Sequence, residues 1–92
     1  MSILKKRRRR KKIKLYLVDD SVNSFQYVIE VLSNTLPECS VIRAEQMATM
    51  THHTGQCHIH TGKSPDVYYV QTMLVKQGLN VISKKYGKDL FN

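Results

Sequence analysis

The chain has 92 residues, of which 41% are hydrophobic and 24% are charged, and its formal net charge is +8. This length allows one small domain and excludes a barrel enzyme or a two-domain cleft, because a single domain usually takes about 100–150 residues. Only two cysteines are present, which excludes a disulfide-stapled secreted scaffold and favours reduced thiols in the cytoplasm.

The positive charge is concentrated at the start of the chain. Residues 1–14 contain nine Lys and Arg and no acid, and the rest contains six Lys and Arg against seven acids, a formal charge of −1. We therefore expect a flexible basic arm over residues 1–12, a core domain over 13–83 and a loose tail over 84–92. No stretch approaches the ~18 apolar residues of a membrane span, and no secretory signal follows the first charges, so no membrane association is expected.

The core domain is predicted to begin with a strand and a helix. Ile13–Val18 is rich in β-formers and partly alternating, which is typical of a strand. Ser24 is a suitable cap for a helix over residues 25–33, because the apolar residues of this segment recur at helical spacing. That apolar stripe consists of Phe25, Val28, Ile29 and Leu32.

A second helix and a second strand are predicted after the break at Pro37. Ser40 can cap a helix over Val41–Thr54, which Gly55 would end. Residues 56–61 alternate and are expected to form a strand. In this strand Cys57 and Ile59 would face the core, and His58 and His60 would share the other face.

The last elements are predicted as a third helix and a third strand. Ser64-Pro65-Asp66 combines a cap, a proline of the first turn and an acid near the helix N-terminus, so a helix should follow and end at Gly78. Residues 79–83 alternate as a strand. The order βααβαβ predicts a small α+β domain in which a three-stranded antiparallel sheet packs against three helices.

The sequence does not favour a metal site or an enzyme. Cys39 and Cys57 lack the Cys-x-x-Cys spacing of a zinc site, and His52 and His53 are adjacent on a predicted helix, so they point in different directions. There is no nucleophile elbow and no Gly-rich phosphate loop. We expect no metal, no cofactor and no catalytic residue.

Two segments carry a resemblance to a known family. Residues 18–32 contain Asp19-Asp20 at the end of a predicted strand, followed by an amphipathic helix. Residues 44–57 contain His52 three residues before Gly55. In this order and placement the chain resembles the ClpS family, the adaptors that deliver N-degron substrates to Clp proteases. The likeness extends over about residues 13–83 and implies the same fold.

The resemblance also implies a site for the first residue of a substrate protein. Asp19 falls where the family has an Asn that contacts the substrate α-amino group, Asp20 falls on the next acid, and His52 matches the histidine that completes the amine site. Asn23 falls near the first peptide unit. The expected walls of the side-chain pocket are Phe25, Val28, Ala48, Thr51 and Leu79.

Some positions depart from the family pattern. Asp19 replaces Asn, which should make the amine site more acidic, and Ser21 replaces a common Asp. Thr51 and Ala48 replace larger or more apolar walls, which suggests a roomier pocket that could admit larger aromatic residues or be less selective.

The resemblance predicts a non-enzymatic, monomeric adaptor with two kinds of partner: N-degron substrates and a ClpA- or ClpC-type unfoldase. The basic arm, with Arg7, Arg8, Arg9 and Arg10, could contact the unfoldase, bind nucleic acid through phosphates, or have no special role. The alternatives are a nucleic-acid-associated module that binds through this arm, and a small enzyme or metal protein that uses the histidines.

Overall fold

A computed structural model describes residues 12–85 of the chain. The elements follow the predicted order: β1 (Ile13–Val18), α1 (Phe25–Thr35), α2 (Val41–Thr54), β2 (Gln56–Gly62), α3 (Ser64–Lys76) and β3 (Val81–Lys85). The arm residues Arg7, Arg8, Arg9 and Arg10 lie outside the described residues, as does residue 86 onward of the predicted tail.

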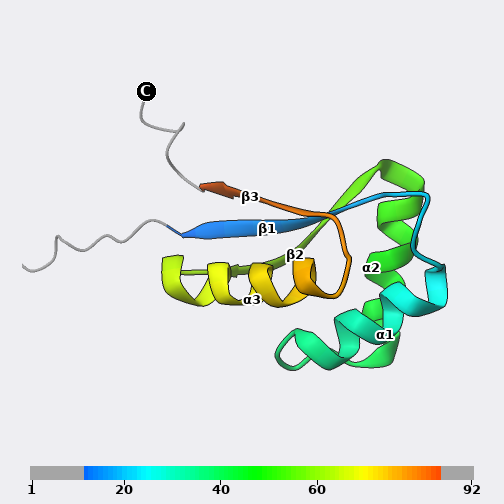
Figure 1. Cartoon of the computed structure of the whole chain (residues 1–92), viewed down its shortest axis with the longest axis horizontal. Helices are drawn as coiled ribbons and strands as arrows, with labels where there is room; N and C mark the ends of the chain where they lie inside the picture. The colour runs from blue at the N-terminus through cyan, green and yellow to red at the C-terminus, as the bar shows by residue number, and fades with distance from the viewer. Residues whose placement is uncertain (1–11, 86–92) are drawn as a thin grey trace, which may run out of the picture.

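The three strands form one antiparallel sheet in the order β2-β1-β3, as expected for the predicted α+β fold. Helix α3 contacts all three strands and covers one face of the sheet, whereas α1 and α2 pack against each other beyond the end of β1 (Figure 1). The central position of β1 therefore carries its last residues into the space beside the two-helix unit.

The core lies between the sheet and the helices. Residues of β1 alternate, so that Ile13, Leu15 and Leu17 are buried while their neighbours are half-buried. Leu32 of α1 and Leu74 of α3 are fully buried against the same core. Each such aliphatic side chain contributes about 1.5–3 kcal/mol through removal from water, which fixes the strand face that meets the helices.

The helix ends follow local sequence signals. Ser24 Oγ accepts a hydrogen bond from the N–H of Tyr27 at 3.1 Å. Ser40 Oγ accepts one from the N–H of Arg43, also at 3.1 Å. Gly55 ends α2 with φ 96°, a left-handed conformation that favours glycine. Both predicted caps and the predicted stop of α2 are therefore confirmed.

The start of α3 differs from the prediction that Ser64 caps it. Because β2 extends to Gly62, a single residue separates strand and helix, and Lys63 takes the extended N-cap conformation. Ser64 is thus the first helical residue, and Pro65 and Asp66 occupy the first turn.

Strand β3 begins and ends two residues later than predicted. The N–H of Leu79 donates to the carbonyl of Leu74, which keeps Leu79 in the turn that closes α3. Lys84 and Lys85, expected in the tail, pair with β1 opposite Lys14 and Ile13.

The prediction that His58 and His60 share a face of β2 is wrong. The register shifts between Leu15 and Tyr16, so that Leu15 lies opposite His60 and Tyr16 lies opposite His58. Since neighbouring residues of β1 face opposite sides of the sheet, so do the two histidines.

None of the helices in the described part of the chain is long and apolar enough to cross a membrane.

Candidate functional site

A cavity of about 380 Å³ lies where the end of β1, the start of α1 and the last turns of α2 meet. Among the described residues, every site residue predicted from the sequence lines it, with the exception of Leu79. The lining also includes residues that the sequence prediction did not assign to the site. The complete lining is Leu17, Val18, Asp19, Asp20, Ser21, Asn23, Phe25, Val28, Ala48, Thr51 and His52.

The backbone brings Asp19 close to the end of α2. The N–H of Val18 donates to Asn80, and the N–H of Asp19 donates to the carbonyl of Gly55 at 2.9 Å. This last bond fastens the end of β1 to the residue that terminates α2. A side chain in the final turn of α2 can therefore reach the one that follows β1.

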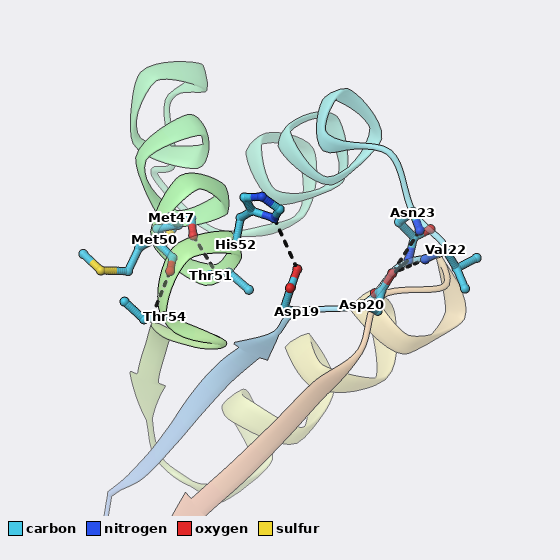
Figure 2. Close-up of polar contacts among 9 residues, drawn as sticks. All are labelled: Asp19, Asp20, Val22, Asn23, Met47, Met50, Thr51, His52 and Thr54. Atoms are coloured by element: carbon cyan, nitrogen blue, oxygen red, sulfur yellow. Dashed lines mark hydrogen bonds and ion pairs between the residues drawn. The ribbon is translucent and has the colours of Figure 1, made fainter.

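Asp19 and His52 face each other across the mouth of the cavity (Figure 2). Asp19 Oδ1 lies 3.9 Å from His52 Nδ1, and the two side chains are 45% and 73% exposed. At this exposure the attraction between them is weak, so both keep most of their hydrogen-bonding capacity for a ligand. His53, the next residue of α2, does not line the cavity.

Asp20 lines the same cavity but directs its carboxylate toward the following loop (Figure 2). Its Oδ1 accepts hydrogen bonds from the N–H groups of Val22 and Asn23, both at 2.9 Å. The bond from the Asn23 backbone is the main cause that lowers the pKa of Asp20 below its ordinary value. Much of the carboxylate is thus engaged in shaping the loop before α1.

Asn23 joins this loop to the far end of α3. Its side-chain amide donates to Asp20 Oδ2 at 3.2 Å and to the carbonyl of Gly78 at 2.9 Å. The hydroxyl of Tyr27 reinforces the link by donating to the carbonyl of Gln77 at 2.6 Å. One wall of the cavity is therefore held by tertiary hydrogen bonds in addition to local ones.

The inner part of the cavity is apolar. Ala48 and Thr51 of α2 are buried, Val28 is half-buried and Phe25 is 47% exposed at the rim. The Thr51 hydroxyl donates to the carbonyl of Met47 at 2.8 Å, so its proton is used within the helix (Figure 2). Thr51 therefore makes the cavity wall less polar than a threonine at this position in the sequence would suggest.

Leu79 does not line the cavity. It is 4% exposed and belongs to the hydrophobic core, because the turn after α3 directs it inward. Leu17, Val18 and Ser21 do line the cavity, although the sequence prediction did not assign them to it. The alternation of β1 predicts that Leu17 is a core residue. It does not indicate that Leu17 also lines the cavity.

His58 and His60 do not join this site. His60 Nε2 lies 3.4 Å from Asp66 Oδ2 of α3, and the ring of His58 lies beside that of Tyr16. Within residues 12–85, no group of three or more His, Cys, Asp or Glu side chains is arranged to hold a metal ion. Cys39 and Cys57 are free thiols, and burial raises the pKa of each.

Comparisons with known proteins give a family match and a similar fold. A family model for the ATP-dependent Clp protease adaptor protein ClpS matches residues 8–81. The chain is also similar to a solved structure, that of Agrobacterium tumefaciens ClpS2 bound to L-phenylalaninamide. The TM-score is 0.69 at 16% sequence identity, and the match covers 84% of this chain and 99% of that one. No curated protein matches the chain.

Proposed function

Because the chain belongs to the ClpS family of ATP-dependent Clp protease adaptor proteins, we propose that its cavity binds the first residue of N-degron substrates. The first residue would carry a free α-amino group and a bulky hydrophobic side chain. The observation that carries this proposal is the pair of Asp19 and His52, 3.9 Å apart, at the mouth of an apolar cavity. The adaptor family also agrees with the expectation that the chain is not an enzyme.

A protein N-terminus is a suitable ligand for the mouth of the cavity. Its α-amino group titrates near 7.7–8.0 and is mostly a cation at neutral pH. The Asp19 carboxylate and an imidazole nitrogen of His52 can accept its N–H groups, and hydrogen bonds to charged groups contribute about 1.5–3 kcal/mol each. An internal residue offers one uncharged N–H and would leave these acceptors unpaired, so the site favours chain ends.

Asp20 and Asn23 have a different part in this proposal. Asp20 adds a second negative charge to the cavity lining, and its hydrogen bonds hold the loop that carries Asn23. The Asn23 amide N–H groups donate to Asp20 and Gly78, and its amide oxygen is the acceptor that we propose for the first peptide unit. We therefore propose Asp20 both as an amine-site charge and as the residue that positions Asn23.

The inner cavity suits the side chain of the substrate. Its volume of about 380 Å³ and its walls of Val28, Ala48 and Thr51 fit one large apolar side chain, whose burial contributes about 1.5–3 kcal/mol. L-phenylalaninamide, the ligand of the similar Agrobacterium tumefaciens protein, has a free α-amino group and an aromatic side chain. This ligand chemistry supports the same assignment here.

The remaining partners are part of the proposal. A ClpA- or ClpC-type AAA+ unfoldase would receive the substrate from a monomeric adaptor, and the family's association with ATP-dependent Clp protease supports such a partner. The free thiols of Cys39 and Cys57 are consistent with the reducing environment of the cytoplasm.

The direct test uses fluorescent peptides that begin with Phe or Leu, each with a free and with an acetylated N-terminus. The free peptides should bind and the acetylated ones should not, since acetylation removes the cation. His52→Ala should weaken binding more than tenfold. His53→Ala removes a ring that lies 5.6 Å from that of His52 but does not line the cavity, so it should weaken binding much less. Equal binding of free and acetylated peptides would overturn the proposal.

A further inference from the structure

The sheet has a second surface that the adaptor site does not use. Helix α3 lies against one face, and no described helix lies on the opposite one (Figure 1). That opposite face carries Lys14 and Tyr16, which alternate with the buried residues of β1, together with their cross-strand partners. We call it the outer face; its members are Lys14, Tyr16, His58, Thr61, Ile82 and Lys84.

Charge on the outer face has one sign. The three strands contain Lys14, Lys84 and Lys85 and no Asp or Glu. Lys14 lies directly opposite Lys84 in the antiparallel pair. Two cations directly opposite each other in a strand pair make this end of the outer face a favourable position for an anion.

The basic arm joins the sheet at this same end. Residues 5–11 are all Lys or Arg, and they precede β1, whose first residue pairs with Lys85. Lys12 is exposed between the arm and the strand. Along the chain, the positive charge of the arm therefore extends through Lys12 to Lys14 of the outer face.

Two aromatic rings lie beside these lysines. The ring centroids of Tyr16 and His58 are 5.5 Å apart, and Lys84 Nζ lies 4.6 Å from the centroid of Tyr16. Desolvation, followed by the charge of Lys14, lowers the pKa of His58, which keeps the imidazole neutral at pH 7. The two rings are tilted by 50° to each other, so each can stack with a separate unpaired base.

A second cavity extends the outer face at the edge of β2. It has a volume of about 390 Å³, and His58 and Thr61 contribute to its lining together with Arg43 of α2. Glu38 is the one acid of this lining. Arg43 adds a cation that can bind a phosphate on the side of His58 away from Lys84.

We propose that the outer face binds single-stranded nucleic acid. Bases stack on Tyr16 and His58, and phosphates contact Lys14 and Lys84 on one side and Arg43 on the other. The Lys84 ammonium moves from the Tyr16 ring to a phosphate when a base takes its place. An acidic peptide would use the lysines but not the rings, and this is why the paired rings favour a nucleic acid.

This surface is separate from the N-degron cavity. The cavity lies at the end of β1, beside Asp19, whereas Lys14 and Lys84 lie near its beginning. The proposal thus makes the protein a two-ligand adaptor, and it does not depend on the peptide site.

The test measures the fluorescence anisotropy of labelled oligo(U) and oligo(dT) with the full chain at several salt concentrations. Lys84→Gln should weaken binding and reduce the slope of log affinity against log salt by about 0.7, the value for one phosphate contact on a single strand. Lys76→Gln makes the same charge change at an exposed position of α3, and it should leave the affinity and the salt slope unchanged. Tyr16→Leu, which keeps an apolar side chain in the sheet, should weaken binding roughly tenfold.

Deletion of residues 1–11 separates the outer face from the arm. The shortened chain should bind more weakly and still depend on Tyr16 and Lys84. Binding that disappears with the arm and is unaffected by Tyr16→Leu and Lys84→Gln in the full chain would overturn the proposal. So would equal affinity for a poly-glutamate peptide of the same charge. Melting temperatures of each variant distinguish lost binding from lost folding.

Discussion

Asp19 Oδ1 lies 3.9 Å from His52 Nδ1 because the backbone of Asp19 is bonded to Gly55, immediately after the helix that carries His52. The distance between the two side chains thus depends on a backbone contact between a strand end and a helix end. Both side chains remain largely exposed, so their weak mutual attraction does not compete strongly with a ligand cation.

The charge of Asp19 should strengthen binding of an N-terminus. Asp19→Asn restores the residue typical of the resembled family and removes the charge. We expect a three- to tenfold loss of affinity for a Phe-first peptide, because a hydrogen bond to a neutral acceptor contributes about 1 kcal/mol less than one to a carboxylate. Isothermal titration calorimetry at two salt concentrations measures this loss, with Glu45→Gln on exposed α2 as the matched charge control. Tighter binding by Asp19→Asn would contradict the assignment.

Asp20 should stabilise the fold in a pH-dependent way. Its pKa is lowered from 3.8, so the folded state binds protons less readily than the unfolded state. The contribution is fully present above pH 3.8 and is lost as the pH falls through the lower pKa of the folded protein. Asp20→Ala should therefore reduce the free energy of unfolding by about 1 kcal/mol or more at pH 7, through the lost bonds to Val22 and Asn23.

Urea unfolding at pH 7 and at pH 3 measures this difference. The difference in free energy of unfolding between the wild-type protein and Asp20→Ala should become smaller at the lower pH, where protonation of Asp20 weakens the same bonds. A gap that widens toward acid pH would show that the carboxylate does not hold the loop.

Ala48 should set the size of the side-chain pocket. It is 4% exposed and lines the inner cavity, so Ala48→Met fills part of the volume of about 380 Å³. We expect affinity for peptides that begin with Trp or Phe to fall more than affinity for peptides that begin with Leu. Thr49→Met, on the exposed side of the same helix, is the control. A uniform effect on all three peptides would place the substrate side chain elsewhere.

The Thr51 hydroxyl should not contribute to substrate binding. It donates to the Met47 carbonyl within α2, and its residue is 3% exposed. Thr51→Val keeps the shape of the wall, so affinity for a Phe-first peptide should change less than twofold. The free energy of unfolding should change by about 1 kcal/mol, because the hydrogen bond to Met47 is lost. A loss beyond tenfold in the same anisotropy assay, with the melting temperature preserved, would show that the hydroxyl contacts the ligand.

Most of the element order could be predicted from local patterns. The alternation of Ile13–Val18 and the caps at Ser24 and Ser40 are short-range signals, and the structure contains the strand and both helices that they indicated. The start of α3 was misplaced because a cap depends on where the preceding strand ends. The two-residue difference at β3 has a similar origin, since Leu79 belongs to the turn that closes α3.

The sequence indicated which residues share the cavity better than it indicated how their side chains are oriented. Eight residues chosen from the sequence line one cavity, whereas Leu79 lies in the core. The sequence did not indicate that the Asp20 carboxylate turns toward Asn23, nor that Asn23 is tied to Gly78. The Asn23–Gly78 bond joins residues 55 positions apart, a separation that carries no repeating signal in the sequence.

The sequence by itself determined which faces are apolar, where the first two helices start and which residue types are available to bind a chain end, because these depend on neighbours a few positions apart. Only the tertiary structure decided that Asp19 meets His52 and that an extra residue in β2 separates His58 from His60. Those outcomes depend on strand register and on backbone bonds between distant segments, which form when the whole core packs together.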